Sequence, residues 1–219
     1  MLKKESNYGE SKFWKFINLA GNAIGLNLLY VLCCLPVVTI GPATSGLYSA
    51  IRYLIRREGW FKGFREGFRK GFLRTMLAGL VCVGSMAYLI LEFNVAVNFF
   101  LETGDFSPMI TCAIPMLFPM TIAAALWPLN VYIPYNTVNW LKNAVNLIVR
   151  APLMVLATAV LFWLPVFLFL YFADYILGIA IIFLGIYFSL AAFVSTILLK
   201  DPLIAQLTLY REEHSETEE

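Results

Sequence analysis

The sequence has few charged residues. Only 14% of its 219 residues are Asp, Glu, Lys or Arg, whereas about a quarter is usual in soluble domains. Hydrophobic residues make up 60% of the chain, and the mean hydropathy is +0.76. A soluble core of this length cannot hide so much apolar surface, so most of the chain must face lipid.

Residues for catalysis and metal binding are also scarce. The single histidine, His214, lies in the polar C-terminal tail, which excludes a Ser-His-Asp arrangement in the core and any multi-histidine metal site. The four cysteines lie inside apolar stretches without metal-ligand spacing. No phosphate-binding loop or dinucleotide-binding fingerprint is present. We therefore expect neither an enzyme nor a cofactor.

The apolar stretches predict an all-α fold, a polytopic transmembrane bundle of five to six membrane-crossing helices. Five stretches are long enough to cross a bilayer: Ile17–Ile40, Thr75–Phe100, Met109–Ile133, Ala151–Phe172 and Tyr175–Leu199. A sixth stretch, Gly41–Ile55, is short and contains Thr44, Ser45 and Ser49.

The positions of Lys and Arg decide between five and six crossings, because these residues stay on the cytoplasmic side. If Gly41–Ile55 crosses, the basic block 52–74 and a predicted loop over 134–150 lie on the same side as both termini, so all 16 Lys and Arg residues are cytoplasmic. The other side keeps the acids Glu92, Glu102, Asp105 and Asp174. If Gly41–Ile55 does not cross, one basic cluster must lie on the outer side of the membrane, contrary to this preference. We therefore predict six crossings.

The segment Leu35–Gly46 combines helix breakers with small polar residues. Fifteen residues of helix reach about 22 Å, less than the hydrocarbon thickness of about 30 Å, so we expect the Gly41-Pro42 turn below the outer surface. Such a broken element can form a polar substrate site, or it can be a tight turn whose Thr and Ser cap the second helix. The candidate site residues are Thr39, Gly41, Pro42, Thr44 and Ser45.

Glu92 is the one acid that lies well inside a predicted span. Ionisable residues within a membrane are candidates for function, so Glu92 joins the candidate polar site. The alternative is that Glu92 lies close enough to the surface to be hydrated. A membrane enzyme would need a pair of acids, and Glu102 is about 15 Å away along a helix, which is too far for direct cooperation.

The block 59–72 predicts a short amphipathic helix on the cytoplasmic face. Phe61, Phe64, Phe68 and Phe72 form one aromatic stripe, and glycines recur every four residues. The glycines indicate either close approach of another backbone or simple flexibility. This pattern is typical of a helix with its rings in the acyl boundary and its cations at anionic headgroups; the alternative is a docking helix for a cytoplasmic partner. The candidate partner or lipid surface consists of Trp60, Phe64, Arg65, Phe68, Arg69 and Lys70.

The run Asn27–Thr44, with Gly46-Leu47-Tyr48 and the later Phe64-x-x-x-Phe68-Arg69, resembles the signature of the YesL-like bacterial membrane proteins. Gly71 departs from this signature, in which a polar residue is expected at that position. The resemblance implies a bacterial plasma-membrane protein of unknown activity, associated with carbohydrate uptake. It transfers no functional residue.

Two functional hypotheses follow. The first is a non-enzymatic accessory or regulatory component of an ABC-type carbohydrate-uptake system, with membrane lipids and transporter subunits as partners and no nucleic acid. The second is a small stand-alone transporter or channel with a polar cavity at 35–46, which Asn27 and Asn130 would also line. We expect one integral membrane domain over residues 1–205 and an acidic, disordered cytoplasmic tail over 206–219.

Overall fold

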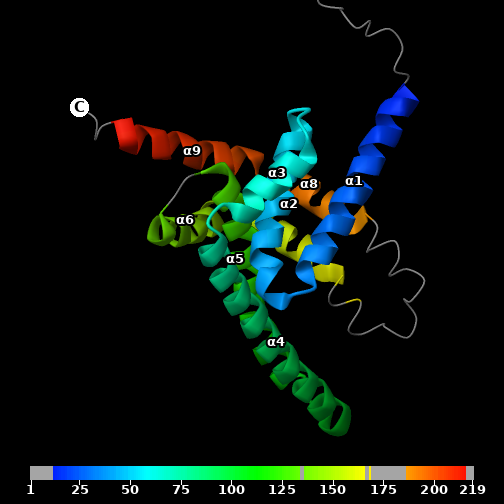
Figure 1. Ribbon diagram of the computed structural model, residues 1–219. Coiled ribbons are helices and arrows are strands. Elements are labelled where there is room, and N and C mark those ends of the chain that lie inside the picture. Colours follow the sequence, from blue (N-terminus) through cyan, green and yellow to red (C-terminus); the bar gives the residue numbers. More distant parts are fainter. Residues whose placement is uncertain (1–11, 134–135, 166–167, 169–185, 216–219) are drawn as a thin grey trace, which may run out of the picture.

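The computed structural model describes residues 12–133, 136–165, 168 and 186–215, and every element in these ranges is a helix (Figure 1). The prediction of an all-helical membrane protein is thus confirmed in outline. By length and apolar composition the described helices supply two candidate spans, or up to four if each of two bent helix pairs counts as one. This is fewer than the five to six predicted; residues 169–185, within two of the predicted spans, lie outside the described residues.

The first predicted span is broken where Leu35-Pro36 suggested. Helix α1 (Lys12–Cys34) ends just before these residues, and the 3₁₀ turn η1 (Val37–Thr39) leads into α2 (Ile40–Ile55). The predicted turn at Gly41-Pro42 is wrong, because both residues already belong to the first turn of α2. Proline is tolerated there, since the first N–H groups of a helix have no intrahelical partner.

Helix α3 (Trp60–Arg69) folds back along α2 (Figure 1). Gly63 and Gly67 make this possible: a Cβ at Gly67 would lie 2.7 Å from the carbonyl oxygen of Ser45, and one at Gly63 would lie 2.7 Å from the Tyr53 ring. Phe64 is buried in the same interface. Phe64 therefore packs against protein and not in the acyl boundary, whereas Phe68 and Phe72 are half-buried and Phe61 is exposed.

The two long helices form an antiparallel pair that projects beyond the other described helices (Figure 1). They are α4 (Phe72–Thr103) and α5 (Ser107–Tyr132). Gly104, at φ 76°, ends α4 in the left-handed conformation that glycine favours. Asp105 then accepts hydrogen bonds from the backbone N–H and the hydroxyl of Ser107, both at 2.9 Å, and these bonds lower its pKa.

The remaining helices close the bundle at the end opposite the α4–α5 turn. Helix α6 (Thr137–Arg150) meets Pro152–Pro165 at a bend of 107°, and α8 (Phe188–Leu198) meets α9 (Lys200–Ser215) at 59°. The sequence suggested only a loop over 134–150. The tail expected to be disordered from residue 206 is instead helical through Ser215, and Gln206 is buried where its amide donates to the carbonyl oxygen of Asn143 at 3.1 Å.

Candidate functional site

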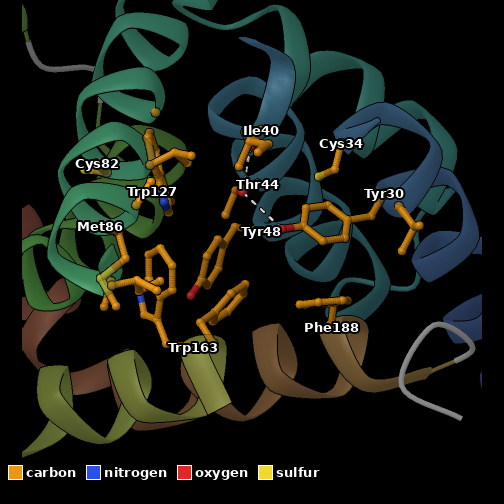
Figure 2. Close-up of a pocket in the computed structure, with 18 residues that line it drawn as sticks. Tyr30, Cys34, Ile40, Thr44, Tyr48, Cys82, Met86, Trp127, Trp163 and Phe188 are labelled. Carbon is orange, nitrogen blue, oxygen red and sulfur yellow. Dashed lines mark hydrogen bonds between the residues drawn. The ribbon is translucent and has the colours of Figure 1, made fainter. Parts of the chain in front are cut away.

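A cavity of about 390 Å³ lies beside the broken helix, between α1, α2, α4 and α5 (Figure 2). Its wall is largely apolar and aromatic, with Met86, Trp127 and Trp163 around it. Polar groups come from α1 and α2: the Tyr30 hydroxyl lies 3.4 Å from Oγ1 of Thr44. Such a space suits a small, mostly apolar ligand that carries one or two hydrogen-bonding groups.

Tyr48 adds a third hydroxyl to this cavity. Its side chain is buried and its ring stacks on Phe162, with the ring centroids 5.7 Å apart. Its hydroxyl interacts with the Ser195 hydroxyl on α8, although among the described residues neither hydroxyl makes a hydrogen bond of good geometry. An unsatisfied buried hydroxyl costs free energy, so this atom would gain from a polar group of a ligand.

The residues predicted for a polar site at 35–46 do not come together around one space. Thr44 lines the cavity, but its hydroxyl also donates to the carbonyl oxygen of Ile40 at 2.7 Å. Thr39 instead holds the turn, donating to the carbonyl oxygens of Cys33 and Pro36 at 2.5 and 2.7 Å. Gly41 and Pro42 are buried in helix packing. Ser45 faces away from the cavity lining, toward α5.

The two asparagines proposed for this cavity are buried in other contacts. Asn27 accepts a hydrogen bond from the backbone N–H of Ser189 at 3.0 Å, which ties α1 to α8. Asn130, fully buried on α5, donates to Oγ of Ser45 at 2.6 Å and to the carbonyl oxygen of Lys70 at 3.2 Å. Its Oδ1 accepts a hydrogen bond from the Arg74 guanidinium. We call Ser45, Lys70, Arg74 and Asn130 the Asn130 network.

Cations gather where α5 ends. The carbonyl oxygen of Val131 accepts hydrogen bonds from Arg52 at 3.0 Å and from Lys70 at 3.3 Å. Arg52 lies 5.1 Å from the Tyr132 ring centroid, and Arg74 lies 5.1 Å from that of Trp140. Burial, with the nearby Arg52 and Arg74, lowers the pKa of Lys70. The carbonyls and negative dipole end of α5, together with the ring faces, offset the repulsion among these cations.

The predicted partner or lipid surface divides into buried and exposed parts. Trp60 donates to Oδ1 of Asn22 at 3.1 Å, and Lys70 turns inward to α5. Phe64 is buried and Phe68 is half-buried. Arg65 and Arg69 remain exposed, and they share the outer face of α3 with Phe61, Lys62 and Glu66. We call Phe61, Lys62, Arg65, Glu66 and Arg69 the outer α3 face.

Glu92 is exposed on α4, in the half of the helix that approaches the α4–α5 turn. It does not line the cavity, although Ile90, two residues before it, does. The structure therefore does not place Glu92 with the residues of the broken helix. Among the described residues, no group of three or more His, Cys, Asp or Glu could hold a metal ion.

Arg52, Arg74 and Trp140 have contacts that sequence reasoning missed. Arg52 and Arg74 sit at the edges of apolar segments, where a cation needs a partner; that position was the available signal. Trp140 is buried and donates to the carbonyl oxygen of Leu126 at 2.8 Å. Its partners lie on other elements, so their identity could not be read from local sequence.

Comparison with known proteins finds a similar family for part of the chain. Residues 23–93 match the sequence profile of a family described as a protein of unknown function, DUF624. The matched region contains the break at 35–39, α2, α3 and most of α4. This part of the chain is thus similar to an uncharacterised family of domains. No curated protein and no solved structure matches the chain significantly.

Proposed function

We propose that the chain is a non-enzymatic plasma-membrane protein with six crossings and both termini in the cytoplasm. Its charge distribution supports this topology. The cations of α2, α3 and the start of α4 lie at one end of the molecule, and Glu102 and Asp105 lie at the α4–α5 turn at the other (Figure 1). Basic residues stay on the cytoplasmic side of a bacterial membrane.

Within this topology, the protein acts as an accessory component of a solute-uptake system, and a carbohydrate transporter is the partner suggested by the YesL-like resemblance. The observation that carries the proposal is the outer α3 face. Close packing at Gly63 and Gly67 fixes α3 against α2, so the backbone positions that carry its exposed cations are fixed relative to one another. A preorganised surface loses little entropy on binding, which favours recognition of an acidic partner surface.

Reversing two charges tests this proposal. We expect Arg65→Glu with Arg69→Glu to reduce the recovery of transporter subunits about tenfold or more, since like-charge contacts across an interface cost several kcal/mol. The measurement is quantitative mass spectrometry of proteins that copurify in mild detergent from cells with native expression. The matched control is Lys142→Glu with Arg150→Glu, two exposed cations on α6.

Two outcomes argue against the proposal. Equal recovery with both double variants would mean that the outer α3 face is not the docking surface. A cysteine at Lys62 that reacts with an impermeant thiol reagent on intact cells, in a cysteine-free background, would place α3 outside and remove the cytoplasmic partner altogether.

A second candidate function rests on the cavity beside the broken helix. The buried Tyr48 hydroxyl and the Tyr30–Thr44 pair offer hydrogen bonds to a solute in an otherwise apolar space. A small stand-alone transporter or channel would use this cavity as its solute site. The largely apolar wall favours a solute with few polar groups over a fully hydroxylated one.

For this candidate, proteoliposomes that contain only this protein should take up a solute, and Thr44→Val should slow uptake about 2- to 12-fold through loss of one neutral hydrogen bond. Thr111→Val is the matched control, because Thr111 also donates to the carbonyl four residues before it but is exposed on α5. Absence of flux for a panel of sugars and small apolar solutes would exclude the transporter.

A further inference from the structure

A second hollow of about 500 Å³ lies between α2, the end of α5, α8 and α9, and it shares no lining residue with the cavity beside the broken helix. We call it the α8–α9 groove. The 59° bend between α8 and α9 places residues of both helices along it. Its lining residues are Arg52, Ile55, Arg56, Tyr132, Phe193, Thr196, Ile197, Lys200, Leu203, Ile204 and Leu207.

The charges of the groove have one sign. Among the residues that the structure describes, Arg52, Arg56 and Lys200 line it, and no acid does. Arg52 also donates to the carbonyl oxygen of Val131. Arg56 and Lys200 are exposed. Asp201 is exposed on the first turn of α9 but does not line the groove. An anion fits this site, and arginine in particular matches the oxygens of a phosphate group.

The rest of the wall is apolar. Ile55, Ile197 and Ile204 are each more than half exposed along the groove. Exposed aliphatic side chains next to cations do not suit a free inorganic anion, which gains nothing from apolar contact. They suit an amphiphile, whose chain covers the aliphatic surface while its headgroup meets the cations.

We propose that the α8–α9 groove binds an anionic phospholipid of the cytoplasmic leaflet. Its phosphate lies between Arg56 and Lys200, and one acyl chain runs along Ile197 and Ile204. The choice of leaflet rests on the topology proposed above, whereas binding itself does not require that topology. A test in detergent therefore separates failure of the lipid site from failure of the membrane orientation.

The experiment is native mass spectrometry of the purified protein in detergent, titrated with phosphatidylglycerol or with phosphatidylcholine of the same chains. We expect specific retention of phosphatidylglycerol. Arg56→Gln with Lys200→Gln should weaken it about 25-fold, since each cation contributes roughly fivefold. Lys142→Gln with Arg150→Gln, which removes the same charge from α6, should leave it unchanged. Ile204→Trp should also lose binding, because it fills the groove and keeps the cations.

Several results would overturn the proposal. Equal retention of both lipids would mean that the cations of the groove do not recognise the anionic headgroup. Unchanged binding in Ile204→Trp would mean that the lipid binds a charged surface through its headgroup and does not occupy the groove. Displacement of the lipid by glycerol 3-phosphate at a similar concentration would identify a free phosphate compound as the ligand.

Discussion

Gly41→Ala is expected to destabilise the protein strongly, although it adds only one methyl group. A Cβ at Gly41 would lie 1.9 Å from the carbonyl oxygen of Thr75 and 3.3 Å from the Cα of Gly79. Both neighbours are backbone atoms of α4, so the two helices must separate to make room. Small residues at such crossings let helix backbones approach closely within a membrane. The cost is expected near the upper end of the range for overpacking, about 3 kcal/mol.

Chemical unfolding in detergent, followed by circular dichroism, measures this loss. Gly84→Ala is the matched control, because Gly84 lies on α4 with no atom within 4 Å of an added Cβ. That variant should be neutral or more stable by up to about 1 kcal/mol, since alanine favours the helix. If Gly41→Ala proves as stable as Gly84→Ala, the close α2–α4 crossing is not present in the protein.

Asn130→Leu is expected to cost about 3 kcal/mol, because it removes one charge-assisted and two neutral hydrogen bonds from the Asn130 network. Leucine has a similar size but leaves Oγ of Ser45 and the carbonyl oxygen of Lys70 without their amide donor. Arg74 loses the Oδ1 acceptor as well. The free energy of unfolding in detergent measures the effect, and Asn98→Leu, at an exposed position on α4, is the control.

A double-mutant cycle assigns the loss to the network. Ser45→Ala and Asn130→Leu should be non-additive by at least about 0.5 kcal/mol, since the two side chains contact each other directly. Ser45→Ala and Asn98→Leu should add. Strict additivity of the first pair would mean that the hydrogen bond between Ser45 and Asn130 contributes nothing to stability.

Several features were predictable from the sequence because they depend on local chemistry. High apolar content with few charges requires helices, since helices satisfy their backbone groups within lipid. Leu35-Pro36 ends α1 because the residue before a proline avoids the helical conformation. The glycines in 59–72 left a close backbone contact or simple flexibility open, and Gly63 and Gly67 make the close contact.

Other features could not be predicted because they depend on which helices meet. The sequence suggested a loop at 134–150, although Trp140, Ala144 and Leu147 repeat at helical spacing and are the buried residues of α6. The aromatic residues of 59–72 have the same spacing whether they face lipid or, as Phe64 does, pack against α2. Only the packed structure distinguishes these two environments.

Composition and helix breakers act locally, so they were sufficient to indicate a helical membrane protein whose first apolar stretch is broken. Which polar residues share a site depended instead on the packing of the helices. Thr39, Thr44 and Ser45 lie within seven positions, yet they face the turn, the cavity and α5 respectively. Successive helical residues point in different directions, so closeness in sequence does not bring side chains together.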